Sequence, residues 1–211
     1  SIKVGVLSGP NLAKEIADEK VAGTVIASKH ADLCHQAREI LSSSTFKIYT
    51  SDDIKGIELA GALKNIYAII SGYCHSLDVG ENAIGLILTR SMAEMSNFAV
   101  HKGANPITFL GLAGMGDLVA TCFSKLSRNY QFGWAIGKGL DIEAAKYKVG
   151  QVAEGLNTIR IIHNEISSSE IKMPLVSGMH EILFNSGSKE LLLEQIINSD
   201  IYVDVNFDVE S

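Results

Sequence analysis

The chain has 211 residues, of which 46% are hydrophobic and 20% are charged. This composition is too apolar for a disordered protein, and the length suits one good core or two small cores that share an interface. The net charge of −6 disfavours a nucleic-acid-binding protein, which normally shows a basic excess. The stretch 57–77 is the most apolar, but Glu58, Lys64 and His75 interrupt it, so we expect no stable membrane insertion.

The cysteines indicate the compartment. Cys34, Cys74 and Cys122 are an odd number at wide spacings, which suits reduced thiols better than a disulfide framework. The 211 residues contain no signal peptide or lipidation motif. A cytoplasmic protein is therefore expected.

No metal site is predicted. Cys34-His35 and Cys74-His75 lack the paired spacing of a zinc knuckle. Satisfied or exposed side chains are the expectation for four further histidines, which have no acidic or cysteine partner at ligand spacing: His30, His101, His163 and His180.

The first part of the chain alternates between strand and helix patterns. Apolar strands are predicted at 2–7, 24–27 and 46–50, and a helix at 31–41. A turn at 8–11 leads into a short helix at 12–19 with Asn11 as its N-cap. Strands separated by helices of this length are typical of an α/β sheet, so residues 1–51 are expected to form part of one.

From Ser51 onward, signals that start and stop helices dominate. A long helix opens at 51–53 and runs to Leu77, and another covers 82–102, with Gly103 as its left-handed terminator. Further helix starts or spans are predicted at Asn105-Pro106, 127–138, Asp141, 155–167, Pro174 and Ser188. Residues 52–199 are thus expected to form an all-helical domain. The acidic tail at 200–211 fits either an edge strand or a disordered end.

Lys64 lies in a predicted helix that is otherwise apolar. No carboxylate stands three or four positions away, so no local ion pair accounts for its charge. Small neighbours leave room for a ligand, and a desolvated lysine can donate or accept a proton. The alternative is a lysine whose charge reaches solvent from a helix face, and this fact alone favours that alternative.

Asp117 follows a glycine-rich break at 114–116. As a local signal it caps the next helix. As a functional signal it is a carboxylate that lies beside Lys64 and orients it. Both interpretations stay open at this point.

A candidate anion site lies at 127–129. Ser127 is predicted to be an N-cap, with Arg128 and Asn129 in the first helical turn. A cation at a helix N-terminus opposes the helix dipole unless an anion binds there. Backbone N–H groups, a hydroxyl and a guanidinium together form a phosphate site, although a solvated first turn is equally compatible. Glu154, at another helix start, either complements the dipole or accepts hydrogen bonds from a ribose or an amide.

The 211 residues contain no dinucleotide fingerprint after a predicted strand. The glycines at 111–116 lie between helices. The glycines at 133–139 resemble a phosphate-binding loop but are one residue too short and lack the Ser or Thr after Lys138. If a nucleotide is used, most of its site lies outside this sequence.

Taken together, these segments resemble the bacterial type of the NAD(P)-dependent glycerol-3-phosphate dehydrogenase family. The matching strings, in family order, are SGP at 8–10, AKE at 13–15, GIEL at 56–59, GALKN at 61–65, TR at 89–90, AEM at 93–95, GLAG at 111–114, GDL at 116–118, TC at 121–122, SRN at 127–129 and QVAEG at 151–155. The resemblance implies a mainly α protein, in which residues 1–51 are the last part of a Rossmann-like domain and an all-helical dehydrogenase domain follows. It also implies interconversion of dihydroxyacetone phosphate and sn-glycerol 3-phosphate with NAD or NADP, for phospholipid synthesis.

The resemblance also assigns roles to residues. Lys64 is implied to protonate the substrate carbonyl oxygen, with Asp117 as its catalytic partner. Substrate binding is implied for Gly9, Asn11, Lys64, Asn65, Asp117, Thr121, Ser127, Arg128 and Asn129. Cofactor contacts are implied for Ala13, Arg128, Val152 and Glu154.

The sequence departs from the family pattern in several places, and the acidic end after Asp200 has no counterpart in that pattern. Asn11 stands where Ser or Thr is usual, and Leu12 where Phe is common. The family's dinucleotide fingerprint and first substrate lysine are missing, so this chain alone is expected to be inactive.

A non-catalytic helical module for dimerisation or phosphate binding is one alternative function, and a homodimer stays open. A dehydrogenase of the hydroxyacid or phosphogluconate superfamily is another, against which the context of Arg128 argues.

Overall fold

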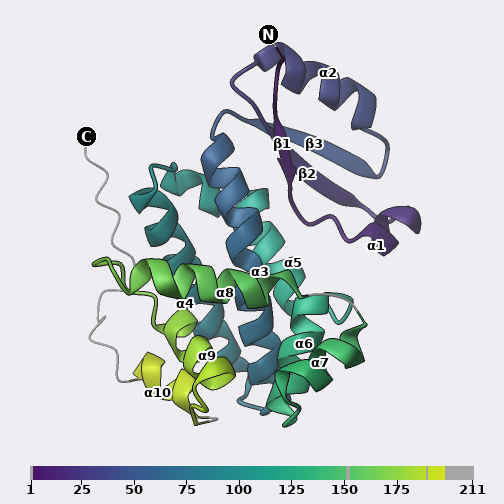
Figure 1. The fold of residues 1–211 in the computed structure, drawn as a ribbon. Coiled ribbons are helices and arrows are strands. Elements are labelled where there is room, and N and C mark those ends of the chain that lie inside the picture. Colours follow the sequence, from purple (N-terminus) through teal and green to yellow (C-terminus); the bar gives the residue numbers. More distant parts are fainter. Residues whose placement is uncertain (1, 151–152, 189, 198–211) are drawn as a thin grey trace.

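The computed structural model describes residues 2–150, 153–188 and 190–197 (Figure 1). A small sheet and two helices lie at one end of the molecule, and a larger helical body forms the rest. The predicted fold class, mainly helical with a short α/β segment first, is confirmed. Within the described residues, no helix is long and apolar enough to cross a bilayer.

The sheet has three strands in the order β1 (Val6–Ser8), β2 (Ala22–Ala27) and β3 (Phe46–Ser51). β1 runs antiparallel to β2, and β2 runs parallel to β3. Helices α1 (Ala13–Ala17) and α2 (Ala31–Leu41) connect them. The first strand is shorter than predicted, because only its last part pairs with β2.

The two faces of β2 have different partners. Val25 and Ala27 pack with Ile57 and Ala113 of the helical body, whereas Ile26 packs with Cys34 of α2 and with Ile48. This alternation follows from the two-residue period of a strand. The sheet is therefore attached to the helical body by one face and covered by α2 on the other.

The helical body contains elements that follow the predicted order. They are α3 (Ile54–Ser76), α4 (Glu81–His101), the 3₁₀ turn η1 (Pro106–Leu110), the wide turn η2 (Leu112–Gly116), α5 (Asp117–Phe123), α6 (Arg128–Gly137), α7 (Ile142–Val149), α8 (Glu154–Ile166), α9 (Pro174–Phe184) and α10 (Leu191–Ile197). Helix α3 is the centre of this body, and α4, α5, α6 and α8 pack around it. Since it is surrounded on most sides, it is apolar nearly all round rather than amphipathic.

Several predicted end signals are confirmed. The Asp53 carboxylate accepts from the Gly56 N–H at 2.9 Å at the start of α3, and the Asp141 carboxylate accepts from the Ala144 N–H at 2.8 Å at the start of α7. Gly103 has a φ of +84°, as its place after α4 predicts.

Asn11 is not the N-cap of α1, contrary to prediction. Leu12 occupies that position, and no side chain caps the helix. The Asn11 Nδ2 instead donates to the Thr24 Oγ1 at 2.8 Å, across to β2. The Asn11 side chain therefore bonds to the neighbouring strand instead of to the first turn of α1. The predicted acidic tail at 200–211 lies outside the described residues.

Two glycines allow α3 and α6 to approach closely. A Cβ added to Gly133 would lie 1.8 Å from the Ile69 carbonyl oxygen, and one added to Gly72 would lie 2.0 Å from the Tyr130 carbonyl oxygen. Each contact is with backbone, which cannot move aside without separating the helices. The close approach also positions the start of α6, where the predicted site residues Arg128 and Asn129 lie.

We predict that Gly133→Ala destabilises the fold by about 3 kcal/mol, because overpacking against backbone costs roughly 1–3 kcal/mol or more. Gly85→Ala is the matched control, since Gly85 is an exposed position in α4 where a Cβ meets nothing within 4 Å. It should be neutral or stabilising by up to about 1 kcal/mol. Urea unfolding of both variants measures the difference, and similar stabilities would contradict the packing argument.

A buried carboxyl, Glu94, joins three helices. The Tyr67 hydroxyl donates to its Oε2 at 3.0 Å, and the Leu175 N–H donates to its Oε1 at 2.7 Å. The second bond satisfies an N–H group at the start of α9 that has no partner inside the helix. Burial raises the pKa of Glu94 to about 8. At neutral pH this group therefore tends to keep its proton in the folded state.

The raised pKa predicts that stability falls as the pH rises from the usual glutamate value of 4.5 towards about 8. In that interval the unfolded chain releases the Glu94 proton and the folded chain retains it, so deprotonation favours unfolding, by up to about 1.4 kcal/mol per pH unit. Glu94→Gln should flatten this slope, and Glu81→Gln at an exposed site of α4 should not. Unfolding free energies across the interval test this, and equal slopes in all three proteins would contradict it.

Candidate active site

Lys64 and Asp117 form an ion pair between the middle of α3 and the first residue of α5. The Asp117 side chain is 2% exposed and the Lys64 side chain 19% exposed. The carboxylate is thus enclosed by protein, whereas the Lys64 side chain stays partly accessible to solvent. The ion pair with Asp117 fixes the position of the Lys64 ammonium, so Lys64 is not a freely solvated surface lysine.

Asp117 has further partners. The Thr121 hydroxyl donates to its Oδ1 at 3.2 Å, and the Gly9 backbone N–H also donates to the carboxylate. Burial raises the pKa of Asp117, while the Lys64 ammonium and these hydrogen bonds favour its ionised form. The carboxylate therefore fixes the position of the Lys64 Nζ and also ties the loop after β1 to the helical body.

Of the two interpretations of Asp117, the helix cap is wrong. Residues 112–116 form a wide helical turn that continues directly into α5, so Asp117 already has helical backbone angles. Gly114 makes this turn possible, because a Cβ there would lie 2.3 Å from the Phe109 carbonyl oxygen. With no free helix end to cap, the Asp117 side chain bonds to α3 instead.

A chain of amide hydrogen bonds lies next to this pair. The Asn129 Nδ2 donates to the Asn65 Oδ1 at 3.0 Å, and the Gly155 N–H donates to the Asn129 Oδ1 at 3.0 Å. The Asn65 Nδ2 donates to the Glu154 Oε2 at 3.4 Å. These bonds join α3, α6 and the start of α8, and they align the N-termini of two helices beside Lys64.

The predicted N-cap of α6 is confirmed. The Ser127 Oγ accepts from the Tyr130 N–H at 3.3 Å. Arg128, the next residue, is exposed and stands in the first turn. A guanidinium at the positive end of a helix is the arrangement that an anion would stabilise.

All these groups face one cleft of about 580 Å³. It is lined by the loop after β1 and by residues of α3, α5, α6 and α8. The structure places in this cleft every predicted site residue that it describes, namely Gly9, Asn11, Ala13, Lys64, Asn65, Asp117, Thr121, Ser127, Arg128, Asn129 and Glu154. Val152, a predicted cofactor contact, lies outside the described residues. The roles of these residues stay predictions.

The sequence analysis missed other residues of the cleft wall. They are Leu7, Ser8, Pro10, Leu12, Lys14, Ala120 and Leu126. Lys14 is the most consequential, because it adds a second exposed cation to a cleft that already contains Arg128. Its place in the AKE string at 13–15 was the available signal.

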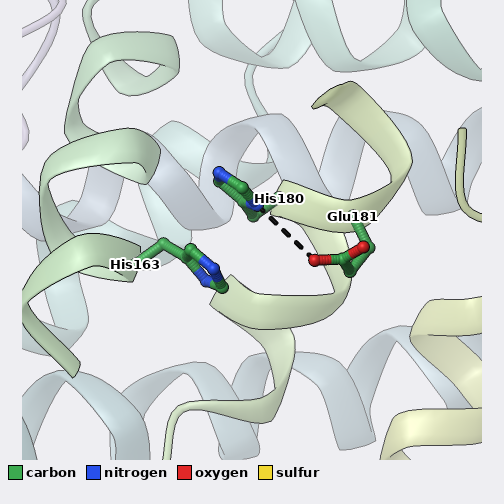
Figure 2. A group of neighbouring side chains, drawn as sticks. All are labelled: His163, His180 and Glu181. Atoms are coloured by element: carbon green, nitrogen blue, oxygen red, sulfur yellow. Dashed lines mark ion pairs between the residues drawn. The ribbon is translucent and has the colours of Figure 1, made fainter. Parts of the chain in front are cut away.

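The expectation of satisfied or exposed histidines is wrong for His163 and His180. Both are partly buried, and the Nδ1 atom of each is buried without a hydrogen-bond partner. Together with Glu181 they form a cluster between α8 and α9 that the cleft does not include (Figure 2).

Comparison with known proteins agrees with the geometry. Residues 53–194 match the family model for the NAD-dependent glycerol-3-phosphate dehydrogenase C-terminus, and residues 1–34 match the model for the N-terminus of the same family. The chain belongs to this family. The family resemblance seen in the sequence is thereby confirmed.

Individual relatives are similar to this chain over nearly its whole length. The glycerol-3-phosphate dehydrogenase [NAD(P)+] of Pseudomonas putida is 49% identical over 97% of this chain, and that of Pseudomonas syringae pv. tomato is equally similar. The chain spans 60% of the length of each relative.

Solved structures give the same result. The glycerol-3-phosphate dehydrogenase of Coxiella burnetii superposes with a TM-score of 0.89 at 35% identity, over 93% of this chain and 61% of that one. That of Saccharomyces cerevisiae gives a TM-score of 0.82 at 26% identity, over 92% of this chain and 60% of that one.

Proposed function

We propose that this chain carries the substrate-binding and proton-transfer part of an NAD(P)-dependent glycerol-3-phosphate dehydrogenase. In this proposal, residues 1–51 belong to the Rossmann-like domain and residues 52–199 form the helical domain. The reaction interconverts dihydroxyacetone phosphate and sn-glycerol 3-phosphate. The observation that supports it best is that two groups line the same cleft. One is the Lys64 ammonium, which Asp117 fixes in place, and the other is the N-terminus of α6 with Arg128.

The phosphate of the substrate binds at the start of α6. The first-turn N–H groups supply hydrogen-bond donors, and the guanidinium of Arg128 can form a bidentate pair with phosphate oxygens. Lys14 lines the same cleft and adds positive charge. These groups favour the binding of a small phosphorylated ketone over the binding of an uncharged one.

Lys64 supplies the proton. Its Nζ donates to the carbonyl oxygen of dihydroxyacetone phosphate as that oxygen gains negative charge during reduction. Asp117 keeps Lys64 oriented, and its negative charge favours the protonated amine before transfer. Because Lys64 is partly exposed, it can recover a proton from solvent after the product leaves. A positioned general acid of this kind contributes typically ~10²–10⁴-fold to the rate.

The cleft also offers groups that fit part of a dinucleotide. Arg128 can pair with an anionic group. The exposed Glu154 carboxylate accepts a bond of 3.4 Å from the Asn65 Nδ2, and a carboxylate has further acceptor capacity for a hydroxyl or an amide. Ala13, Arg128 and Glu154 would contact NAD or NADP, most of whose site we assign to a segment outside this sequence. When bound, its nicotinamide supplies or accepts the hydride.

Lys64→Met tests the proton-transfer role. In a form of the protein that also includes a glycine-rich nucleotide-binding segment, we expect kcat to fall at least ~100-fold, with a much smaller change in KM, because the variant keeps the side chain's size and loses the proton. NADH oxidation with dihydroxyacetone phosphate measures this. Lys20→Met, at an exposed ion pair with Glu15, is the control and should be normal. Near-normal turnover of Lys64→Met would refute the assignment.

Arg128→Ala tests the phosphate role. We expect KM for dihydroxyacetone phosphate to rise at least ~10-fold, since a charge-assisted bond contributes ~1.5–3 kcal/mol. With unphosphorylated dihydroxyacetone, kcat/KM should change much less. An equal loss of kcat/KM for both ketones would show that Arg128 does not recognise the phosphate group.

A further inference from the structure

The second cluster of chemically active side chains lies between α8 and α9 (Figure 2). His163 comes from α8, and His180 and Glu181 come from α9. One ligand atom of each residue lies within 4.8 Å of those of the other two. His163 is nine positions beyond Glu154 in the same helix, or ~13 Å along its axis, so this cluster is separate from the cleft.

Two buried nitrogen atoms in this cluster lack hydrogen-bond partners. The Nδ1 atoms of His163 and His180 are both buried, and neither forms a hydrogen bond within the part of the chain that the structure describes. The two rings stack nearly parallel, with centroids 3.7 Å apart and planes 9° apart. Buried polar atoms without a partner are rare in folded proteins and require an explanation, such as a role in binding an ion.

The carboxylate of Glu181 is held in place beside one of the two rings. The Glu181 Oε1 lies 3.7 Å from the His180 Nδ1 (Figure 2). A neutral imidazole has the lone pair that a metal ion needs. The Asn185 Nδ2 donates to both carboxylate oxygens of Glu181 at 3.0 Å, which orients this group.

We propose that His163, His180 and Glu181 bind one divalent transition-metal ion of the zinc type, which links α8 to α9. Two imidazole nitrogens and one carboxylate oxygen suit zinc, and a water molecule would complete a tetrahedral site. Neither Mg²⁺ nor Ca²⁺ fits, since both prefer oxygen ligands. The proposal does not depend on the proposed dehydrogenase function.

Binding requires a small rearrangement. The lone pair of an imidazole lies in the ring plane, so two stacked rings cannot both direct one at the same ion. One ring must turn out of the stack, and the three ligand atoms must approach one another to ~3.3 Å for bonds of ~2.0–2.1 Å. Both histidines are only partly buried, and we infer that one ring turns toward its exposed side when the ion enters.

The test titrates the metal-free 211-residue chain with Zn²⁺, with calorimetry for stoichiometry and NMR for the histidine ring signals. We expect one saturable site per chain, and shifts of the His163 and His180 signals that are complete at one equivalent. His163→Gln and His180→Gln should each weaken binding at least ~10-fold, since loss of a ligand costs more than the ~10–100-fold typical of loss of its supporting partner. His35→Gln is the matched control, because His35 forms an exposed pair with Glu39 and has no third ligand among the described residues.

Three results would overturn the proposal. They are the absence of saturable one-to-one binding, ring shifts at His35 instead of the cluster, or unchanged affinity in both glutamine variants. Circular dichroism of the metal-free variants verifies that they are folded. If one variant does not fold, the NMR titration of the unmodified chain still decides, because it reports which rings bind the ion.

Discussion

The enclosed carboxylate of Asp117 is the contact on which the arrangement of the cleft depends. A charged group with this little exposure is costly unless it is paired and hydrogen-bonded, and Lys64, Thr121 and Gly9 supply those partners. They come from a long central helix, from α5 itself and from the loop after the first strand. One carboxylate therefore holds together the sheet segment, the helical body and the amine that we assign to proton transfer.

The rest of the cleft depends on helix packing that only small residues allow. Gly133 and Gly72 let α6 lie against α3, and this closeness brings Asn129 within hydrogen-bond distance of Asn65. Asn129 in turn holds the start of α8 through the Gly155 N–H. Two helix N-termini consequently point to the side of α3 that carries Lys64. The polar groups at the cleft are thus positioned by backbone contacts deep in the body.

Local signals in the sequence were sufficient for much of the fold. Helix starts at Asp53, Ser127 and Asp141 were predicted from capping chemistry that involves residues only two or three positions apart, and the structure contains those bonds. The same reasoning failed at Asn11 and Asp117, where a partner distant in sequence replaced the local one. Capping residues bond to whatever donor or acceptor the tertiary structure offers, which local patterns do not contain.

The site itself was predicted in part. Spacing alone favoured a solvated Lys64, and only the ordered set of family strings indicated that residues 9 to 154 meet in one place. The cluster of His163, His180 and Glu181 had no sequence signal, because its members meet only where α8 and α9 pack together. Glu94 was equally hidden, since an acid in a helix normally faces water and nothing local shows that this one is buried.

The most direct test of the central claim is an NMR titration of the isotope-labelled chain with sn-glycerol 3-phosphate. We expect saturable shifts of the backbone amides of Gly9, Asn65, Arg128 and Asn129, together with the Lys64 side-chain signal, while the sheet face covered by α2 stays unchanged. Absence of saturable shifts, or shifts confined to a surface outside the cleft, would contradict the assignment of this cleft as the substrate site.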